Sequence, residues 1–292
     1  MTNMFCKFRP LQTFLRSHII NANYAAKASI ECNARMLVNV IQDEKKQIAN
    51  VIMQRPPVNS LNLELLEQLT ATIKDLEKKQ FRGMILSSSS PTVFSAGLDI
   101  TEMYKPKEER LRQFWKALQT MWKTLYLTPL VTIAAINGHA PAGGCLVSLS
   151  CDHSIMVKSR ASIGLNETML GIVAPQWFRK VYINSIGFRQ AEHALKLGKM
   201  FSPEEALKLG LVNELVDSPS DVLPKAQEEM EKWMKIPASA LQMTKLSLRK
   251  PDVDELISYE KKELEEIVFF VNQEKVQAML GKYFESLKGK KQ

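Results

Sequence analysis

Short apolar runs alternate with helix-forming segments along this chain, and the alternation strongly limits the folds that it can adopt. Met36–Ile41 and Ile48–Met53 flank a polar stretch at 42–47 and predict a β-hairpin. Later apolar runs predict buried strands at Phe81–Leu86, Val131–Ile136 and Ile155–Val157. Apolar residues also recur at helical spacing around 65–76 and 111–127. Strands connected through helices form βαβ crossovers, so we expect an α/β fold with a largely parallel sheet.

From about residue 188 the pattern is almost entirely helical. The predicted helices are Gln190–Leu197, Pro203–Leu209, Pro224–Met234, Ala238–Leu248 and Asp252–Leu287. Gly198 and Gly210 each follow a predicted helix in the position of a C-cap, where glycine adopts a left-handed backbone at little cost. We therefore expect an α/β core at 33–200 and a helical C-terminal region at 201–292.

The net charge of +8 is concentrated at the two ends of the chain. Residues 1–30 carry four basic and no acidic side chains, and residues 281–292 carry four lysines and one glutamate, which leaves +1 for residues 31–280. Because the body is nearly neutral, it offers no broad basic face, and we expect no nucleic-acid partner. No apolar run approaches the roughly 20 residues that cross a bilayer, so no integral membrane association is expected.

The first 30 residues mix basic, apolar and hydroxyl-bearing side chains and contain no acid. That composition is typical of a mitochondrial transit peptide, so we assign residues 1–32 to a presequence and expect a protein of the mitochondrial matrix. A disordered basic tail is the alternative. The four cysteines form no CxxC pair, and Cys6 and Cys32 fall in this segment, so neither a disulfide framework nor a zinc site is expected.

A small-residue turn, Phe94-Ser-Ala-Gly-Leu-Asp-Ile100, follows the predicted strand at 81–86. Gly97 permits backbone angles that are closed to other residues, and Asp99 is suited to cap a helix that begins near Ile100. A free N–H at such a turn is a good donor to an anionic oxygen. Simple helix capping explains the same residues without any ligand.

A second turn, Asn137-Gly-His-Ala-Pro-Ala-Gly-Gly-Cys-Leu146, follows the strand at 131–136 and opens a helix at Gly143. Gly143 and Gly144 allow a ligand to approach the backbone closely, although close packing of a helix on a sheet makes the same demand. The phosphate-binding motifs GxxxxGK[ST] and GxGxxG are both absent. Cys145 lacks a base with an orienting acid, and no serine-hydrolase or zinc-hydrolase motif is present.

Glu167 is the only acid between Ala161 and Pro175, in an otherwise almost uncharged stretch. A carboxyl in apolar surroundings has a raised pKa and is able to take up and return a proton near neutral pH. Together with two turns that present backbone amides, Glu167 indicates proton abstraction next to a carbonyl group. A buried structural carboxyl is the alternative.

The two turns and the later acid, in this order, resemble the crotonase (enoyl-CoA hydratase/isomerase) superfamily. The resemblance covers about residues 36–290 and extends to Arg55-Pro-Pro-Val-Asn-Ser-Leu61 and Ile163–Pro175. It implies a spiral of ββα units with a helical C-terminal region that builds a homotrimer. It also implies an acyl-CoA substrate, whose coenzyme A is part of the substrate, and no metal or redox cofactor.

By this resemblance, the N–H groups of Leu98 and Gly143 form an oxyanion hole for the thioester oxygen, with Glu167 as the catalytic acid and base. The substrate-binding residues that the resemblance implies are Ala96, Gly97, Leu98, Asp99, Ile100 and Gly143.

One departure from the family pattern narrows the expected reaction. Hydratases of the family carry a second glutamate where this chain has Leu146. Water addition uses two carboxyls, whereas a shift of a double bond needs one. We therefore expect an isomerase that converts cis- or trans-3-enoyl-CoA to trans-2-enoyl-CoA in the β-oxidation of unsaturated fatty acids. The alternatives are a hydratase, a thioesterase or a non-catalytic crotonase-fold protein that binds a partner such as RNA.

Overall fold

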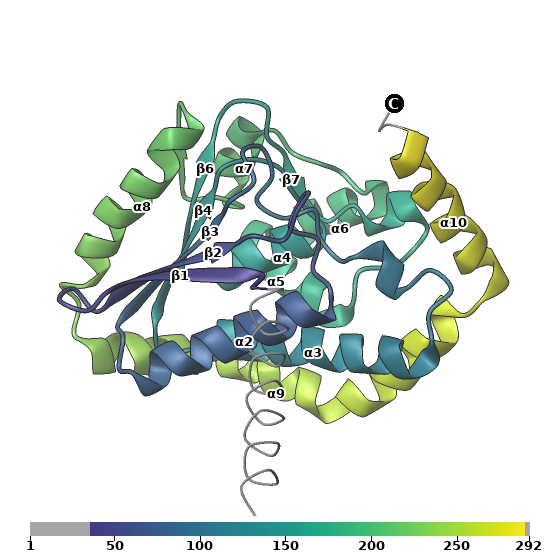
Figure 1. Cartoon of the computed structure of the whole chain (residues 1–292), viewed down its shortest axis with the longest axis horizontal. Helices are drawn as coiled ribbons and strands as arrows, with labels where there is room; N and C mark the ends of the chain where they lie inside the picture. The colour runs from purple at the N-terminus through teal and green to yellow at the C-terminus, as the bar shows by residue number, and fades with distance from the viewer. Residues whose placement is uncertain (1–35, 290–292) are drawn as a thin grey trace, which may run out of the picture. The chain divides into compact units, whose positions relative to one another are not determined.

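Six strands form one sheet in the order β1-β2-β3-β4-β6-β8, and β5 and β7 form a separate pair (Figure 1). This architecture is that of a computed structural model, which describes residues 36–289. The presequence predicted at 1–32 lies outside the described residues. The strands are β1 Val38–Asp43, β2 Ile48–Met53, β3 Gly83–Ser88, β4 Val131–Ile136, β5 Ala140–Pro141, β6 His153–Val157, β7 Ile163–Gly164 and β8 Glu214–Val216.

The large sheet is parallel except at its first pair. β1 and β2 form the predicted antiparallel hairpin, in which Val38 pairs with Met53 and Asp43 pairs with Ile48. The pairs β2–β3, β3–β4, β4–β6 and β6–β8 are all parallel. Parallel neighbours need a crossover connection. The first three crossovers contain α2 (Leu63–Lys78), α3 (Glu108–Leu127) and α4 (Gly143–Ser150), which confirms the predicted α/β arrangement.

The central strands are covered by helices on both faces, which explains their continuous apolar sequence. Successive side chains of a strand point to opposite faces. On one face, Ile85, Ile133 and Ile155 pack with Val222 and Met230 of α8 (Pro219–Trp233). Alternate residues of the same strands belong to the larger apolar cluster that contains buried residues of α2, α3 and α4. In Figure 1, α8 therefore lies across the sheet from these three helices.

The remaining helices follow the sheet. They are α5 Gln176–Ile186, α6 Phe188–Leu197, α7 Pro203–Leu209, α9 Ala238–Val271 and α10 Glu274–Gly289, with short 3₁₀ turns η1 Ile100–Glu102 and η2 Glu167–Leu170. Gly198 and Gly210 end α6 and α7 with φ of 56° and 85°, so both predicted C-caps are confirmed. None of the helices within residues 36–289 has the length and apolar character to cross a membrane.

The predicted helix boundaries near the C-terminus are partly wrong. α8 begins at Pro219, where Ser218 caps it, and Pro224 lies inside the helix. α9 continues through Pro251, and the break comes at Asn272. Buried contacts on both sides of Pro251 offset the cost of a proline in a helix, because Lys245 bonds to Leu130 O and Leu256 is fully buried. The short strand β8, which pairs with β6, was not predicted.

Candidate active site

The turn at Leu98 is held against the loop that follows β2. Leu61 and Leu98 form an isolated parallel bridge, in which Leu61 N–H donates to Gly97 O at 2.8 Å and Asp99 N–H donates to Leu61 O at 3.0 Å. In such a bridge the N–H of Leu98 itself points away from Leu61. Gly97 has φ of +84°, a conformation that favours glycine, and it turns the chain to present this amide.

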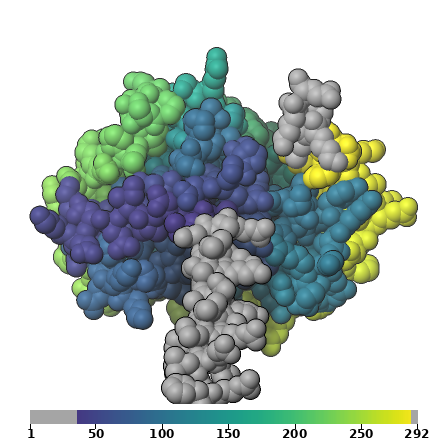
Figure 2. All heavy atoms as spheres, in the orientation of Figure 1, coloured from purple at the N-terminus to yellow at the C-terminus, as the bar shows by residue number. Residues whose placement is uncertain are grey.

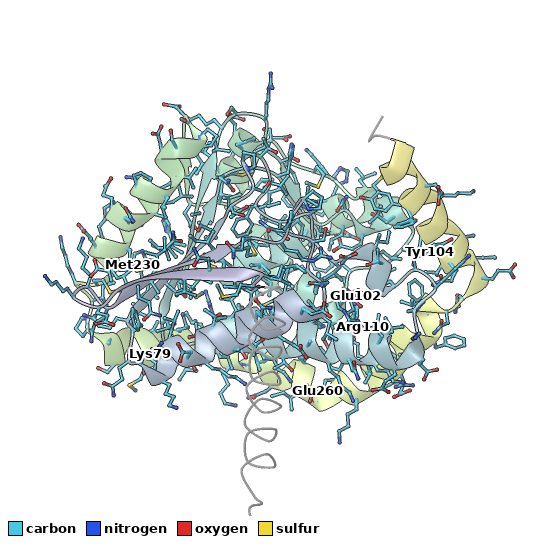
Figure 3. The ribbon with its side chains drawn as sticks, viewed as in Figure 1. Lys79, Glu102, Tyr104, Arg110, Met230 and Glu260 are labelled. Carbon is cyan, nitrogen blue, oxygen red and sulfur yellow. The ribbon has the colours of Figure 1, made fainter. Side chains whose placement is uncertain are left out.

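Asp99 caps a single 3₁₀ turn instead of a longer helix. Its carboxylate accepts from Thr101 N–H at 2.9 Å, so the predicted capping role is confirmed, but the turn ends at Glu102. Glu102 is 5% exposed and accepts two hydrogen bonds from Arg110 of α3, and the two side chains lie together in Figure 3. Glu102 also accepts from Leu63 N–H at the start of α2. The segment after Leu98 is therefore anchored to two helices.

The second turn opens α4 at Gly143, as the sequence predicts. The first N–H groups of a helix have no partner within the helix and carry its positive dipole end. Gly144 lets α4 approach the first turn, because a Cβ added there would lie 2.4 Å from Ser95 O. The two turns are thus packed directly against each other, and only a glycine fits at this contact.

The amides of Leu98 and Gly143 lie side by side. A Cβ added to Gly143 would come 3.3 Å from Leu98 N, and one added to Gly97 would come 3.0 Å from Gly143 N. Among residues 36–289, neither N–H donates a hydrogen bond to a protein group. Two neighbouring amides without a protein acceptor are suited to bind one oxygen atom that carries negative charge.

Glu167 begins the 3₁₀ turn η2, and Gly171 ends this turn in the left-handed conformation. Glu167 is 6% exposed, and its buried Oε2 atom has no hydrogen-bond partner among the described residues. Burial raises the pKa of Glu167 to about 7, because the carboxylate loses its hydration. A carboxyl with this pKa is able to accept and return a proton at neutral pH.

Glu167 and the first turn line one small pocket of about 60 Å³. Its walls include Ala96, Leu98 and Ile100 from the first turn and Ala142 from the second. The other predicted site residues, Gly97, Asp99 and Gly143, are not part of the lining. Gly97 and Gly143 contact the lining residues Ala142 and Leu98, whereas the side chain of Asp99 turns toward Arg55 and Thr101.

The residues that close the pocket carry no distinctive sequence signal. Leu280 and Tyr283 of α10 line it, together with Met103, Leu170 and Ile172. In Figure 2 the surface of α10 borders that of the segment after Leu98. Gln277 donates to Met103 O at 2.9 Å and accepts from Lys105 N–H, and the Phe284 ring stacks on Tyr104. In the sequence, only the helical spacing of the apolar residues in α10 indicates this packing.

Cys145 and Leu146 are both fully buried beside these groups. Burial raises the pKa of the Cys145 thiol well above its usual range, and the nearby Glu167 carboxylate adds to the effect. The ring of His139, the histidine nearest to Cys145 in the sequence, forms its hydrogen bond with Ser162 Oγ. These features oppose a nucleophilic role for Cys145. Leu146 belongs to the main apolar cluster. Of the residues that line the pocket, only Glu167 carries a carboxyl group.

A buried carboxyl, two neighbouring unused amides and a mostly parallel sheet with a helical C-terminal region are the features expected of the crotonase class. The sequence pattern of the enoyl-CoA hydratase/isomerase family matches residues 43–291, and the chain belongs to that family. The chain is 44% identical over 262 residues to mouse enoyl-CoA delta isomerase 1, mitochondrial, covering 89% of each chain.

Similarity to solved structures agrees with this assignment. The chain superposes on the crystal structure of human mitochondrial delta3-delta2-enoyl-CoA isomerase with a TM-score of 0.86 and 42% identity, covering 88% of this chain and 100% of that one. It is also similar to an enoyl-CoA hydratase from Bacillus halodurans, with a TM-score of 0.76 and 25% identity over 84% of this chain and 99% of that one. The predicted family and fold are confirmed.

Proposed function

We propose that this protein is an enoyl-CoA isomerase that converts 3-enoyl-CoA, cis or trans, to trans-2-enoyl-CoA. The observation that carries the proposal is the pocket in which Glu167 is the only lining carboxyl and which Leu98 also lines. Relatives at 43% to 46% identity are named enoyl-CoA delta isomerase 1, which supports the same reaction.

The first step of the reaction is removal of a proton from C2 of the substrate by the Glu167 carboxylate. The C2–H bond breaks, and its electron pair delocalises over C2, C3 and C4 and onto the thioester oxygen. The resulting dienolate oxygen accepts hydrogen bonds from the N–H groups of Leu98 and Gly143. Losing one such preorganised donor typically raises the barrier by about 3 kcal/mol. The two amides therefore lower the barrier to forming the dienolate.

The second step returns the same proton to C4 from the protonated Glu167. The double bond then lies between C2 and C3, and Glu167 is again a carboxylate. Because the product is an isomer of the substrate and no electrons leave, the proposed reaction needs no redox cofactor. The pKa of Glu167, about 7, suits both steps, since the group must be a base first and an acid afterwards.

The test is the turnover of cis- and trans-3-enoyl-CoA by the wild-type protein and by Glu167→Gln, with hydration of trans-2-enoyl-CoA followed in parallel. We expect wild-type isomerisation to be much faster than hydration, and the variant to lose at least a hundredfold in kcat. Glu192→Gln, which removes a partly exposed carboxyl on α6 that pairs with Arg189 and Lys196, is the control. Near-normal turnover by Glu167→Gln would rule out Glu167 as the base, and dominant hydration would favour a hydratase.

The proposed assembly is a homotrimer, and the proposed location is the mitochondrial matrix. Large apolar side chains are exposed along α9 at Met243, Leu248, Ile257 and Phe269, which is consistent with a surface that partner subunits cover. The relatives are named mitochondrial, and the basic, acid-free N-terminus has the composition of a presequence. Sedimentation equilibrium tests the trimer. Import into isolated mitochondria, with shortening of the chain, tests the location.

A further inference from the structure

Arg55 makes two polar contacts that converge on the first turn of the active site. This residue follows β2, and its side chain is 22% exposed. One guanidinium nitrogen, Nη1, donates to Ser60 O at 3.0 Å. The other, Nη2, donates to the Asp99 carboxylate at 2.5 Å. Asp99 is the residue directly after Leu98, and its side chain is only 9% exposed.

The contact with Ser60 begins a chain of hydrogen bonds that ends at the oxyanion hole. The carbonyl of Ser60 and the N–H of Leu61 belong to one planar peptide group, so fixing one fixes the direction of the other. Leu61 N–H donates to Gly97 O at 2.8 Å. Gly97 O in turn shares a peptide plane with Leu98 N–H. The guanidinium of Arg55 is therefore linked to Leu98 N–H through two peptide groups and the hydrogen bond between them.

The same chain also affects the strength of the final donor. Hydrogen bonds in series polarise one another, and a cation that donates to the first carbonyl increases the positive charge on the last N–H. We propose that Arg55 is a positioning residue, which aligns and polarises Leu98 N–H for the thioester oxygen. The inference rests on the proposed function, because it assigns Arg55 a part in stabilising the dienolate.

The charge of Asp99 explains why a cation is needed at this position. A carboxylate next to Leu98 repels the negative charge that develops on the substrate oxygen, and the repulsion is strong where water is largely excluded. Arg55 neutralises this carboxylate while Asp99 continues to cap η1 through Thr101. The planar guanidinium reaches both Ser60 O and Asp99, whereas a lysine ammonium has a different geometry and holds two divergent acceptors less well.

The local loop is built to keep Arg55 in place. Asn59 accepts from Arg55 N–H at 2.7 Å and donates to Ser88 Oγ at 2.8 Å. Ser95 Oγ donates to Asn59 O at 2.7 Å, which joins the loop after β2 to the first turn. Because these contacts do not involve the guanidinium, a substitution of its side chain leaves the backbone of the loop anchored.

The experiment compares Arg55→Met with the wild type and with Arg112→Met. Arg112 is a matched control, since its side chain is 25% exposed and pairs with Glu108 and Glu265 away from the pocket. We expect kcat for 3-enoyl-CoA to fall about tenfold to a hundredfold in Arg55→Met, with little change in KM. Arg112→Met keeps the wild-type values. Thermal unfolding checks that each variant is folded.

A spectroscopic readout separates positioning from a general loss of structure. A bound cinnamoyl-CoA thioester absorbs at longer wavelength when its carbonyl oxygen is polarised, and we expect this shift to shrink in Arg55→Met. Arg55→Lys keeps the charge and should give an intermediate absorption shift and an intermediate kcat. If Arg55→Met does not fold, Arg55→Lys is compared with the wild type in its place. A rise in KM alone, or an unchanged absorption shift, overturns the inference. An inactive wild type would instead contradict the proposed function.

Discussion

Gly143 lies so close to Leu98 that a Cβ added to Gly143 would come within 3.3 Å of the Leu98 amide nitrogen. The same Cβ would come 3.0 Å from Leu61 Cδ1 and 3.2 Å from Leu98 Cδ2, so a side chain at position 143 would crowd both the amide and these two leucines. This relationship places the proposed oxyanion hole at the junction of two turns that are far apart in the sequence.

Gly143→Ala is expected to reduce kcat/KM for 3-enoyl-CoA by at least tenfold, because the methyl group occupies space that the substrate oxygen needs. Stability should fall by about 1 kcal/mol, because the added Cβ crowds Leu61 Cδ1 at 3.0 Å and Leu98 Cδ2 at 3.2 Å. Steady-state kinetics and thermal unfolding measure the two effects. Gly83→Ala, whose added Cβ meets Met230 on the opposite face of the sheet, should alter stability and leave kcat unchanged. Full activity of Gly143→Ala would contradict an oxyanion hole at this position.

The pH dependence of the reaction should report the raised pKa of Glu167. The carboxylate form is required to remove the C2 proton, and burial places the pKa at about 7. Activity is therefore lost as the pH falls through this value, and kcat/KM should reach a plateau above it. The profile of kcat/KM between pH 5 and pH 9 tests this expectation. A half-maximum near the ordinary glutamate value of 4.5 would show that Glu167 is hydrated in solution or is not the base.

The same shift links Glu167 to stability. Its pKa is about 7 in the folded state against 4.5 for an ordinary glutamate, so folding favours the protonated form. The contribution is fully present below pH 4.5 and is lost as the pH rises through 7, a change of about 3 kcal/mol in the free energy of unfolding. Glu167→Gln does not titrate, so the variant should gain most of this amount, about 2.5 kcal/mol, relative to the wild type between pH 5 and pH 8. Urea unfolding at the two pH values measures the difference. If the variant and the wild type differ in the free energy of unfolding by the same amount at pH 5 and pH 8, the pKa of Glu167 is not raised.

Much of the α/β fold follows from local sequence signals. Val131–Ile136 is predicted with its observed bounds because a central strand covered on both faces is apolar throughout. Helix ends with a clear cap, such as Leu209 before Gly210, are also predicted correctly. The sequence does not predict that α9 continues through Pro251. Tertiary contacts such as the hydrogen bond from Lys245 to Leu130 O outweigh the local effect of the proline. Such contacts join residues far apart in the chain and leave no local pattern.

The candidate site likewise combines residues that the sequence reveals with residues that only the fold brings together. Glu167, Gly97 and Gly143 stand out in the sequence because each is unusual among its neighbours. Leu280 and Tyr283, which close the pocket, are ordinary apolar residues of a helix, and only the fold of α10 over η1 brings them there. Arg55 belongs to a motif that the resemblance includes, but its role depends on two hydrogen bonds that the sequence does not reveal.

Leu146→Glu tests why this chain should isomerise and not hydrate its substrate. Leu146 lies in the first turn of α4, where the family's hydratases carry their second glutamate, and it is 1% exposed. A carboxyl here supplies a second acid and base for water addition, so we expect hydration of trans-2-enoyl-CoA to rise about tenfold or more above the wild-type rate. Burying the new carboxyl also costs about 1–3 kcal/mol of stability, so unfolding is measured in parallel. Leu146→Met, which conserves volume and polarity, should retain isomerisation without gaining hydration. A folded Leu146→Glu variant with no hydratase activity would mean that features other than the missing acid, such as the closure of the pocket by α10, keep water from the reaction.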